Sequence, residues 1–169
     1  MPVNSVDLEN ELVDVGKEVD MLASGLAIFQ ASAADADPAW SWLAVQGLAS
    51  GVEKIYTGCE RIMAMIASSV DGARVEQTEG WHISLLKRMA NSFPDVRAAV
   101  ISEQTYKALD RLRSFGHSER DTYGLVLDRE IVVERASQTI EAFGQFNLEL
   151  AVFIAAMNSS DAAASEGSS

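Results

Sequence analysis

Apolar residues recur at alternating spacings of four and three in the N-terminal part of the chain. At about 3.6 residues per turn, this spacing gathers them into one stripe along an α-helix, the pattern of a helix that packs lengthwise against a partner. The stripe consists of Leu8, Leu12, Val15, Val19, Leu22, Leu26 and Phe29. The spacing therefore predicts a first helix with one buried face and charged residues towards water.

Cap and turn signals surround two further apolar segments. Asp37 can cap a second helix with Pro38 at its first position, where the missing N–H of proline costs nothing. This helix is predicted to end near residue 70. A shorter third helix is predicted at about residues 79–92, and Pro94 ends it.

Two more helices complete the pattern. Ser102 can cap the fourth helix, while Ile101 and Tyr106 form a hydrophobic staple. Asp128 can cap the last helix, whose apolar positions keep the helical spacing as far as Met157. No segment alternates convincingly as a strand. The predicted fold is therefore all-α, an up-and-down bundle of four long helices plus a shorter one.

A strip of small residues runs along one side of the second helix. Its members are Ala44, Gly47, Gly51 and Gly58. Small side chains let another helix approach closely, although glycine lowers helix stability. The strip predicts close packing against a helix of the same chain, and a contact with a second copy remains the alternative.

Length and composition indicate one domain in a reducing compartment. The 169 residues suffice for a single helical domain, predicted over residues 1–157, and the Ser, Ala and acidic residues of 158–169 predict a disordered tail. The single cysteine, Cys59, cannot form an internal disulfide, and no secretory leader pattern opens the sequence. The longest apolar run is shorter than a membrane span. A cytoplasmic protein without a membrane contact is therefore expected.

The charge balance limits what the chain can bind. With 13 Lys and Arg against 25 Asp and Glu, the net charge is −12. Indiscriminate nucleic-acid binding needs clustered positive charge, so any RNA has to enter a local basic patch. No set of His, Cys and carboxylate residues has the spacing of zinc ligands, so neither a metal nor another cofactor is predicted.

Arginine and histidine residues concentrate on one segment of the fourth helix. At about 100° per residue, Arg113, His117 and Arg120 fall within roughly 60° of one another, and Tyr106 lies in the same arc. Guanidinium groups bind phosphate oxygens, and an imidazole moves protons near neutral pH. The strip suits a phosphodiester ligand. The alternative is a solvated charged face, which is the commoner role of such residues.

Three segments of the chain carry a family resemblance. The first, residues 112–128, reads LRSFGHSERDTYGLVLD and resembles the Leu-Arg-x-Phe-x-His-x-x-Arg-x-x-Tyr-Gly-x-x-Leu-Asp segment of HepT-like proteins, within the HEPN superfamily (higher eukaryotes and prokaryotes nucleotide-binding). Residues 54–66 read KIYTGCERIMAMI and resemble that family's Tyr-Thr-Gly-x-Glu-Arg-Ile segment. Residues 81–89 read WHISLLKRM and resemble its Trp-His-x-x-Leu-Leu-x-x-Met segment. The likeness covers roughly residues 38–155.

The resemblance implies a homodimeric helical domain and, in active members, a metal-independent ribonuclease toxin of a toxin–antitoxin system. In that mechanism the ribose 2′-hydroxyl attacks the adjacent phosphate, a histidine transfers protons, and an arginine stabilises charge on phosphorus. Arg113, His117 and Arg120 are then the candidate catalytic residues, with RNA as the substrate. Tyr123 is the position that a partner nucleotidyltransferase, the antitoxin, would nucleotidylate.

Three further residues are candidates for lining the same cleft: His82, Tyr106 and Arg111. His82 belongs to the Trp-His-x-x-Leu-Leu-x-x-Met resemblance, and its alternative role is that of a packed or capping histidine. Arg111 points out of the arc that holds the candidate catalytic residues.

The chain departs from the family's Arg-x4-His-x-Tyr motif. When the motif's tyrosine is aligned with Tyr123, its arginine and histidine fall on Gly116 and Asp121, which cannot perform that chemistry. The motif is therefore degenerate in this register.

Two pairings with His117 remain. Arg111 has five intervening residues, as the family's spacing allows, but lies about 120° away around the helix. Arg113 lies closer than Arg111 to His117 around the helix, but it is one residue too close to His117 along the chain for the family's spacing. Two other functions also remain open: a catalytically inactive dimeric module that binds a protein such as a nucleotidyltransferase, and a nucleotide-binding scaffold.

Overall fold

Five helices form the described part of the computed structural model, which covers residues 5–32, 37–121 and 129–166, with side chains except at 116–121 and 165–166. In chain order they are α1 (Ser5–Ala31), α2 (Pro38–Ser69), α3 (Trp81–Ala90), α4 (Glu103–Asp121) and α5 (Arg129–Glu166). Within these ranges there is no strand, only an isolated bridge between Phe93 and Arg97. The prediction of an all-α bundle with four long helices and a shorter one is confirmed.

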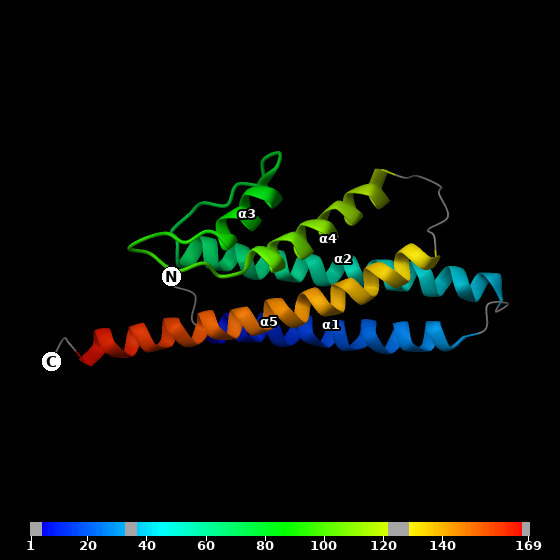
Figure 1. Cartoon of the computed structure of the whole chain (residues 1–169), viewed down its shortest axis with the longest axis horizontal. Coiled ribbons are helices and arrows are strands. Elements are labelled where there is room, and N and C mark those ends of the chain that lie inside the picture. Colours follow the sequence, from blue (N-terminus) through cyan, green and yellow to red (C-terminus); the bar gives the residue numbers. More distant parts are fainter. Residues whose placement is uncertain (1–4, 33–36, 122–128, 167–169) are drawn as a thin grey trace.

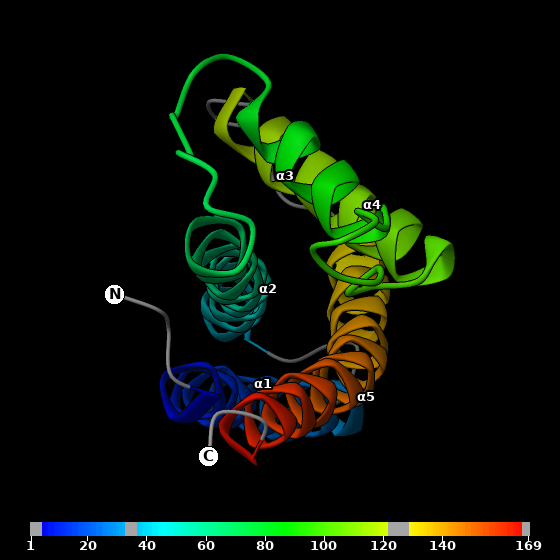
Figure 2. The same ribbon diagram turned by 90° about the vertical axis from the view of Figure 1, so that its left-hand side faces the viewer.

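The helices stack in three layers. α2 lies in the middle, between α1 on one side and α3 and α4 on the other, and α5 crosses obliquely from beside α4 to beside α1 (Figure 1, Figure 2). α1 contacts α2 and α5 but neither α3 nor α4. Side chains that α2 shares with α3 and α4 are therefore on the opposite side of the middle layer from α1.

α1 packs with the face that the apolar spacing predicts. All seven residues of the predicted stripe are buried: Leu8, Leu12, Val15, Val19, Leu22, Leu26 and Phe29. The small residues of α2 receive this face. A Cβ atom at Gly58 would collide with Val15 Cγ2, and one at Gly51 would come within 3.0 Å of Leu22 Cδ1. Close packing within the chain, the favoured interpretation of the small-residue strip, is confirmed at Gly51 and Gly58, whereas Gly47 is exposed and a Cβ there would meet nothing within 4 Å.

Two predicted helix caps are present. The Asp37 carboxylate accepts hydrogen bonds from Ala39 N at 2.8 Å and Trp40 N at 3.2 Å, which satisfies two of the N–H groups that have no partner within the helix. Ser102 Oγ accepts from Thr105 N at 3.2 Å at the start of α4. The predicted cap at Asp128 lies outside the described residues.

α3 is shorter than its predicted range of about 79–92. It begins at Trp81 because Gly80 takes a left-handed φ of 76°, which glycine adopts at no steric cost. It ends before Asn91, which is extended. Gly80 therefore decides where the side chains of the first turn of α3 point.

A buried ion pair ties the loop between α3 and α4 to the end of α2. Arg97 and Asp71 make two parallel hydrogen bonds, Nε to Oδ1 at 2.6 Å and Nη2 to Oδ2 at 2.8 Å, and both side chains are almost fully buried. Arg97 also donates to the carbonyls of Asn91, Ala98 and Arg88. A charge buried this deeply is stable because every donor direction has a partner. The clamp holds α3 and α4 in position beside α2.

α5 extends further than the apolar pattern predicts. It continues to Glu166, past Met157, where the sequence placed the end of the domain, but the side chains from Asn158 to Ala164 are exposed. A window of this helix is long and apolar enough to cross a membrane by length and composition. Within this helix Phe146 and Leu150 are completely buried in the bundle, whereas Leu148 and Val152 are exposed.

Candidate functional site

Polar side chains from three helices gather on the side of α2 that faces α3 and α4. They are Tyr56 and Glu60 from α2, His82 from α3, and Asp110 and Arg113 from α4, and we refer to them as the polar cluster. Helical spacing places Tyr56 and Glu60 one turn apart on the same face of α2. The cluster is unusual because the rest of this face is hydrophobic core.

Glu60 and His82 form a hydrogen-bonded pair within the polar cluster. His82 Nδ1 and Glu60 Oε2 are hydrogen-bonded, and they join α2 to α3. The Glu60 side chain is 9% exposed and the His82 side chain 27% exposed, so the pair leads from the interior to the surface. The indole ring of Trp81 lies against the imidazole, with ring centroids 4.0 Å apart. The imidazole is therefore held on its edge by a carboxylate and on its face by an aromatic ring.

The Tyr56 hydroxyl is the buried neighbour of this pair. Burial raises the pKa of Tyr56 far above its ordinary value, and the Glu60 carboxylate raises it further. The Arg113 guanidinium acts in the opposite direction on the same pKa. The hydroxyl completes no hydrogen bond of good geometry with the residues that the structure describes. It is therefore neutral at physiological pH.

Arg113 supplies the positive charge of the polar cluster. Its Nε donates to Asp110 Oδ1 at 2.8 Å, one turn earlier on α4. The Arg113 side chain is 17% exposed, whereas Asp110 is 38% exposed. This contact fixes the orientation of the guanidinium and offsets part of its charge.

The predicted site residues do not all share this location. Arg113 and His82 belong to the polar cluster, and Tyr106 is half-buried against the hydrophobic core. Arg111 is exposed and lines a different groove of about 280 Å³ between α4 and α5, together with residues such as Gln138. Arg111 and Arg113 therefore point to opposite sides of α4, as the helical geometry predicted.

The remaining predicted residues are not described in atomic detail. His117 and Arg120 lie on the last turns of α4, and their side chains lie outside the described part of the structure. Tyr123 lies outside the described residues altogether. The assignment of these three positions stays a prediction.

Sequence reasoning missed three members of the polar cluster: Tyr56, Glu60 and Asp110. A signal for two of them was present, because Tyr56 and Glu60 lie in the segment that resembles Tyr-Thr-Gly-x-Glu-Arg-Ile. Glu60 also falls between buried Cys59 and Ile62, where a carboxylate needs a partner. Its partner, however, is set by how α3 packs on α2, which spacing along one helix does not reveal.

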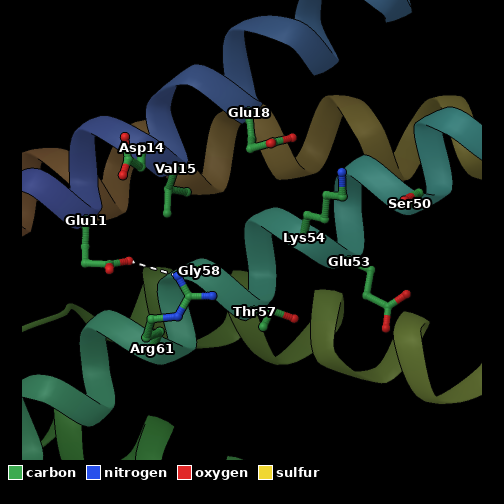
Figure 3. A pocket seen from close by; sticks show the side chains of 10 residues that line it. All are labelled: Glu11, Asp14, Val15, Glu18, Ser50, Glu53, Lys54, Thr57, Gly58 and Arg61. Atoms are coloured by element: carbon green, nitrogen blue, oxygen red, sulfur yellow. Dashed lines mark hydrogen bonds and ion pairs between the residues drawn. The ribbon is translucent and has the colours of Figure 1, made fainter.

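A second polar groove lies on the opposite side of α2. It has a volume of about 430 Å³, runs between α1 and α2, and is lined by Glu11, Asp14, Val15, Glu18, Ser50, Glu53, Lys54, Thr57, Gly58 and Arg61 (Figure 3). Arg61 Nη1 is bonded to Glu11 at 3.0 Å, and the four carboxylates outnumber the two cationic side chains. This groove repels a polyanion and is a poor site for RNA.

The described residues contain neither a cluster of metal-binding side chains nor a reactive cysteine. No group of three or more His, Cys, Asp or Glu side chains converges on one point among them. Cys59 is fully buried, and burial raises the pKa of its thiol to about 12, so that it carries no thiolate at neutral pH. The polar cluster is thus the best-built candidate site that the described residues contain.

The helical bundle and the comparisons with known proteins assign the chain to a class and a family. The all-α bundle is of the HEPN type. The chain belongs to the HepT-like proteins, because the model of that family matches residues 47–157. The matched range contains every member of the polar cluster and excludes α1. No curated protein and no solved structure matches the chain.

Proposed function

We propose that the chain is a toxin-type, metal-independent endoribonuclease of a toxin–antitoxin system, or a weakened descendant of one. The observation that carries the proposal is Arg113, an oriented and mostly buried guanidinium whose charge acts on Tyr56, the residue on which the Glu60 carboxylate also acts. Membership of the HepT-like proteins supports it. A cation and titratable groups in one place are what phosphodiester cleavage without a metal requires.

In the proposed reaction, Arg113 and Arg120 bind the scissile phosphate of RNA. A guanidinium offers several donors to phosphate oxygens, and it stabilises the extra negative charge that develops on phosphorus in the transition state. Asp110 holds Nε of Arg113, so that the side chain is oriented before substrate arrives. His117 transfers protons, and no metal or cofactor takes part.

The proposed partners follow from the same resemblance. The chain acts in the cytoplasm as a homodimer, and the antitoxin is a nucleotidyltransferase that modifies Tyr123. Nucleotidylation would add a bulky anion at Tyr123, which would oppose the binding of the polyanion RNA by charge repulsion. The acidic surface outside the site, part of the net charge of −12, restricts RNA to that one patch.

An inactive dimeric interaction module is the second candidate. The ion pair of Arg113 with Asp110 favours it, since a partly neutralised guanidinium attracts phosphate less strongly. On this view the polar cluster maintains the fold, and the protein surface binds a nucleotidyltransferase.

An RNA digestion assay separates the two candidates. Purified wild-type protein and His117→Ala are incubated with a mixed RNA pool in the presence of a chelator. The proposal expects cleavage by the wild type, and at least about a hundredfold slower cleavage by His117→Ala. Equal cleavage by both proteins removes His117 as a catalytic residue, and no cleavage by either favours the interaction module. In that case, if a nucleotidyltransferase is encoded beside the protein, calorimetry with that enzyme tests for a stable complex.

A further inference from the structure

We infer that an apolar groove between α1 and the first half of α2 is the surface through which two copies of this chain associate. The inference names the interface of the homodimer in the proposed function, and it rests on that dimer but not on RNA cleavage. The groove has a volume of about 450 Å³. Its walls include Met21, Gly25 and Ile28 from α1, and Trp40, Ala44 and Gly47 from α2.

Large apolar side chains are exposed along both walls of the groove. On α1, Met21 is 71% exposed and Ile28 is 64% exposed. On α2, Trp40 is 37% exposed, and Leu43, one helical turn before Gly47, is 62% exposed. A contiguous apolar surface of this kind on a soluble protein marks an interaction site, because it is stabilised by removal from water.

The area of this surface matches what a dimer interface needs. At roughly 200 Å² for a fully exposed side chain of this size, the four side chains together expose on the order of 450 Å². In a standard interface each partner contributes about 800 Å², of which about 57%, or roughly 450 Å², is non-polar. The groove therefore supplies the apolar part of one half of such an interface.

The groove has both projections and recesses, as an interface between identical copies requires. In a two-fold dimer the same patch lies on both sides, so each projection has to find a recess in the other copy of that patch. Met21 and Ile28 are the projecting side chains of α1. Gly25 and Gly47 leave recesses, since a Cβ at Gly47 would meet nothing within 4 Å and one at Gly25 only Leu48 Cδ2, at 3.9 Å. Side chains of one copy can therefore enter the recesses of the other.

The charge of the groove favours a second copy as its occupant. The chain has a net charge of −12, so two copies repel each other wherever acidic surfaces meet. Among the residues that line the apolar groove, only Glu18 and Lys54 are charged, and their charges cancel. The neighbouring groove between the same helices has four carboxylates against two cations, and a basic partner would be drawn there instead (Figure 3). Of the two grooves, the apolar one is where two acidic chains meet with less repulsion.

This surface is separate from the polar cluster. Gly47 and Tyr56 are nine residues apart on α2, which places them about 180° apart around the helix. A dimer through the groove therefore keeps the polar cluster of each copy away from the interface. α1 and the first turns of α2 also precede residue 47, where the match to the HepT-like proteins begins, so family membership does not imply this surface.

Analytical ultracentrifugation of the full chain tests the inference. The wild type is expected to sediment at twice the 18.2 kDa mass of the chain. Ile28→Glu puts a charge into the apolar groove and should raise the dissociation constant of the dimer at least about a hundredfold, as the loss of a central apolar contact does. The matched control is Val152→Glu, which adds the same charge at an exposed β-branched residue of α5 and should match the wild type. Far-UV circular dichroism and urea denaturation check that both variants fold.

Cysteine cross-linking locates the interface. Ser50→Cys puts a thiol on the wall of the groove, whereas Ser137→Cys puts one on α5, at a position that does not line the groove; both serines are exposed. Cys59 does not interfere, because it is buried. A short bismaleimide should join two Ser50→Cys chains into a covalent dimer, and Ser137→Cys should remain a single chain on a denaturing gel.

The outcomes separate the surface from the proposed function. A monomeric wild type would overturn the inference together with the proposed homodimer, and would leave the groove to a different protein. A dimer that Ile28→Glu does not weaken, or that Val152→Glu weakens equally, would show that the copies associate through another surface, so that the inference is wrong while the homodimer stands. A dimer that Ile28→Glu dissociates and Ser50→Cys cross-links supports the inference, even if the protein cleaves no RNA.

Discussion

Alanine at Gly58 should destabilise the bundle, whereas alanine at Gly47 should stabilise it. Both glycines lie on α2 and both would gain helix propensity, about 0.8–1 kcal/mol for glycine to alanine in a helix interior. A Cβ at Gly47 meets nothing within 4 Å, so the whole gain should appear as stability. A Cβ at Gly58 collides with Cγ2 of Val15 on α1. The difference between the two variants isolates the contact between α1 and α2.

The size of the difference follows from the nature of the neighbour. Val15 is β-branched and stiff at χ1, so it cannot swing away cheaply, and overpacking of this kind costs about 1–3 kcal/mol. Gly58→Ala should therefore be less stable than Gly47→Ala by about 1–3 kcal/mol. Gly51→Ala should fall between them, because its Cβ would lie 3.0 Å from Leu22 Cδ1, the end of a more flexible side chain.

Urea denaturation followed by far-UV circular dichroism measures this series. For a chain of this length, 1 kcal/mol corresponds to about 2–4 °C in Tm, so thermal unfolding is an independent check. The order Gly47→Ala, Gly51→Ala, Gly58→Ala from most to least stable supports the packing described for α1. Equal stability of the first and last variants would refute it, because α1 would then not approach α2 at Gly58.

Three further predictions concern the buried polar groups. Arg97→Ala should lower the free energy of unfolding by about 3–5 kcal/mol, because it leaves the Asp71 carboxylate buried without its bidentate partner. A loss below about 1 kcal/mol in urea denaturation would contradict this prediction. Cys59 should resist a thiol reagent in the native protein at pH 8, because burial raises the pKa of its thiol to about 12 and favours the neutral form. Labelling should occur only as the protein unfolds. Rapid labelling of the native protein would disprove the burial of Cys59. Tyr56→Phe should change stability by less than about 1 kcal/mol, because the buried hydroxyl has no well-formed hydrogen bond to lose, and a larger loss in urea denaturation would show that it has a partner.

The fold was largely predictable because helices are local. The alternating four and three spacing from Leu8 to Phe29 identified the buried face of α1, and the cap at Asp37 identified the start of α2. The extent of α5 was harder to predict, since the exposed turns after Met157 have no apolar spacing to mark them.

The candidate site was less predictable because its contacts join distant parts of the chain. Glu60 and His82 are 22 residues apart, and Asp71 and Arg97 are 26 apart. Such pairs depend on the angle and register at which helices pack, and the periodicity of one helix carries no information on either. Within α4, by contrast, helical geometry correctly separated Arg113 from Arg111.

Cleavage of RNA by Arg113→Ala and Arg111→Ala tests the central claim most directly. The two substitutions remove the same side chain from the same helix, but Arg113 belongs to the polar cluster and Arg111 faces the groove beside α5. If Arg113 binds the scissile phosphate, Arg113→Ala should cleave RNA at least about a hundredfold more slowly than the wild type. Arg111→Ala should cleave at nearly the wild-type rate. Equal rates for the two variants, with both proteins folded, would contradict the account.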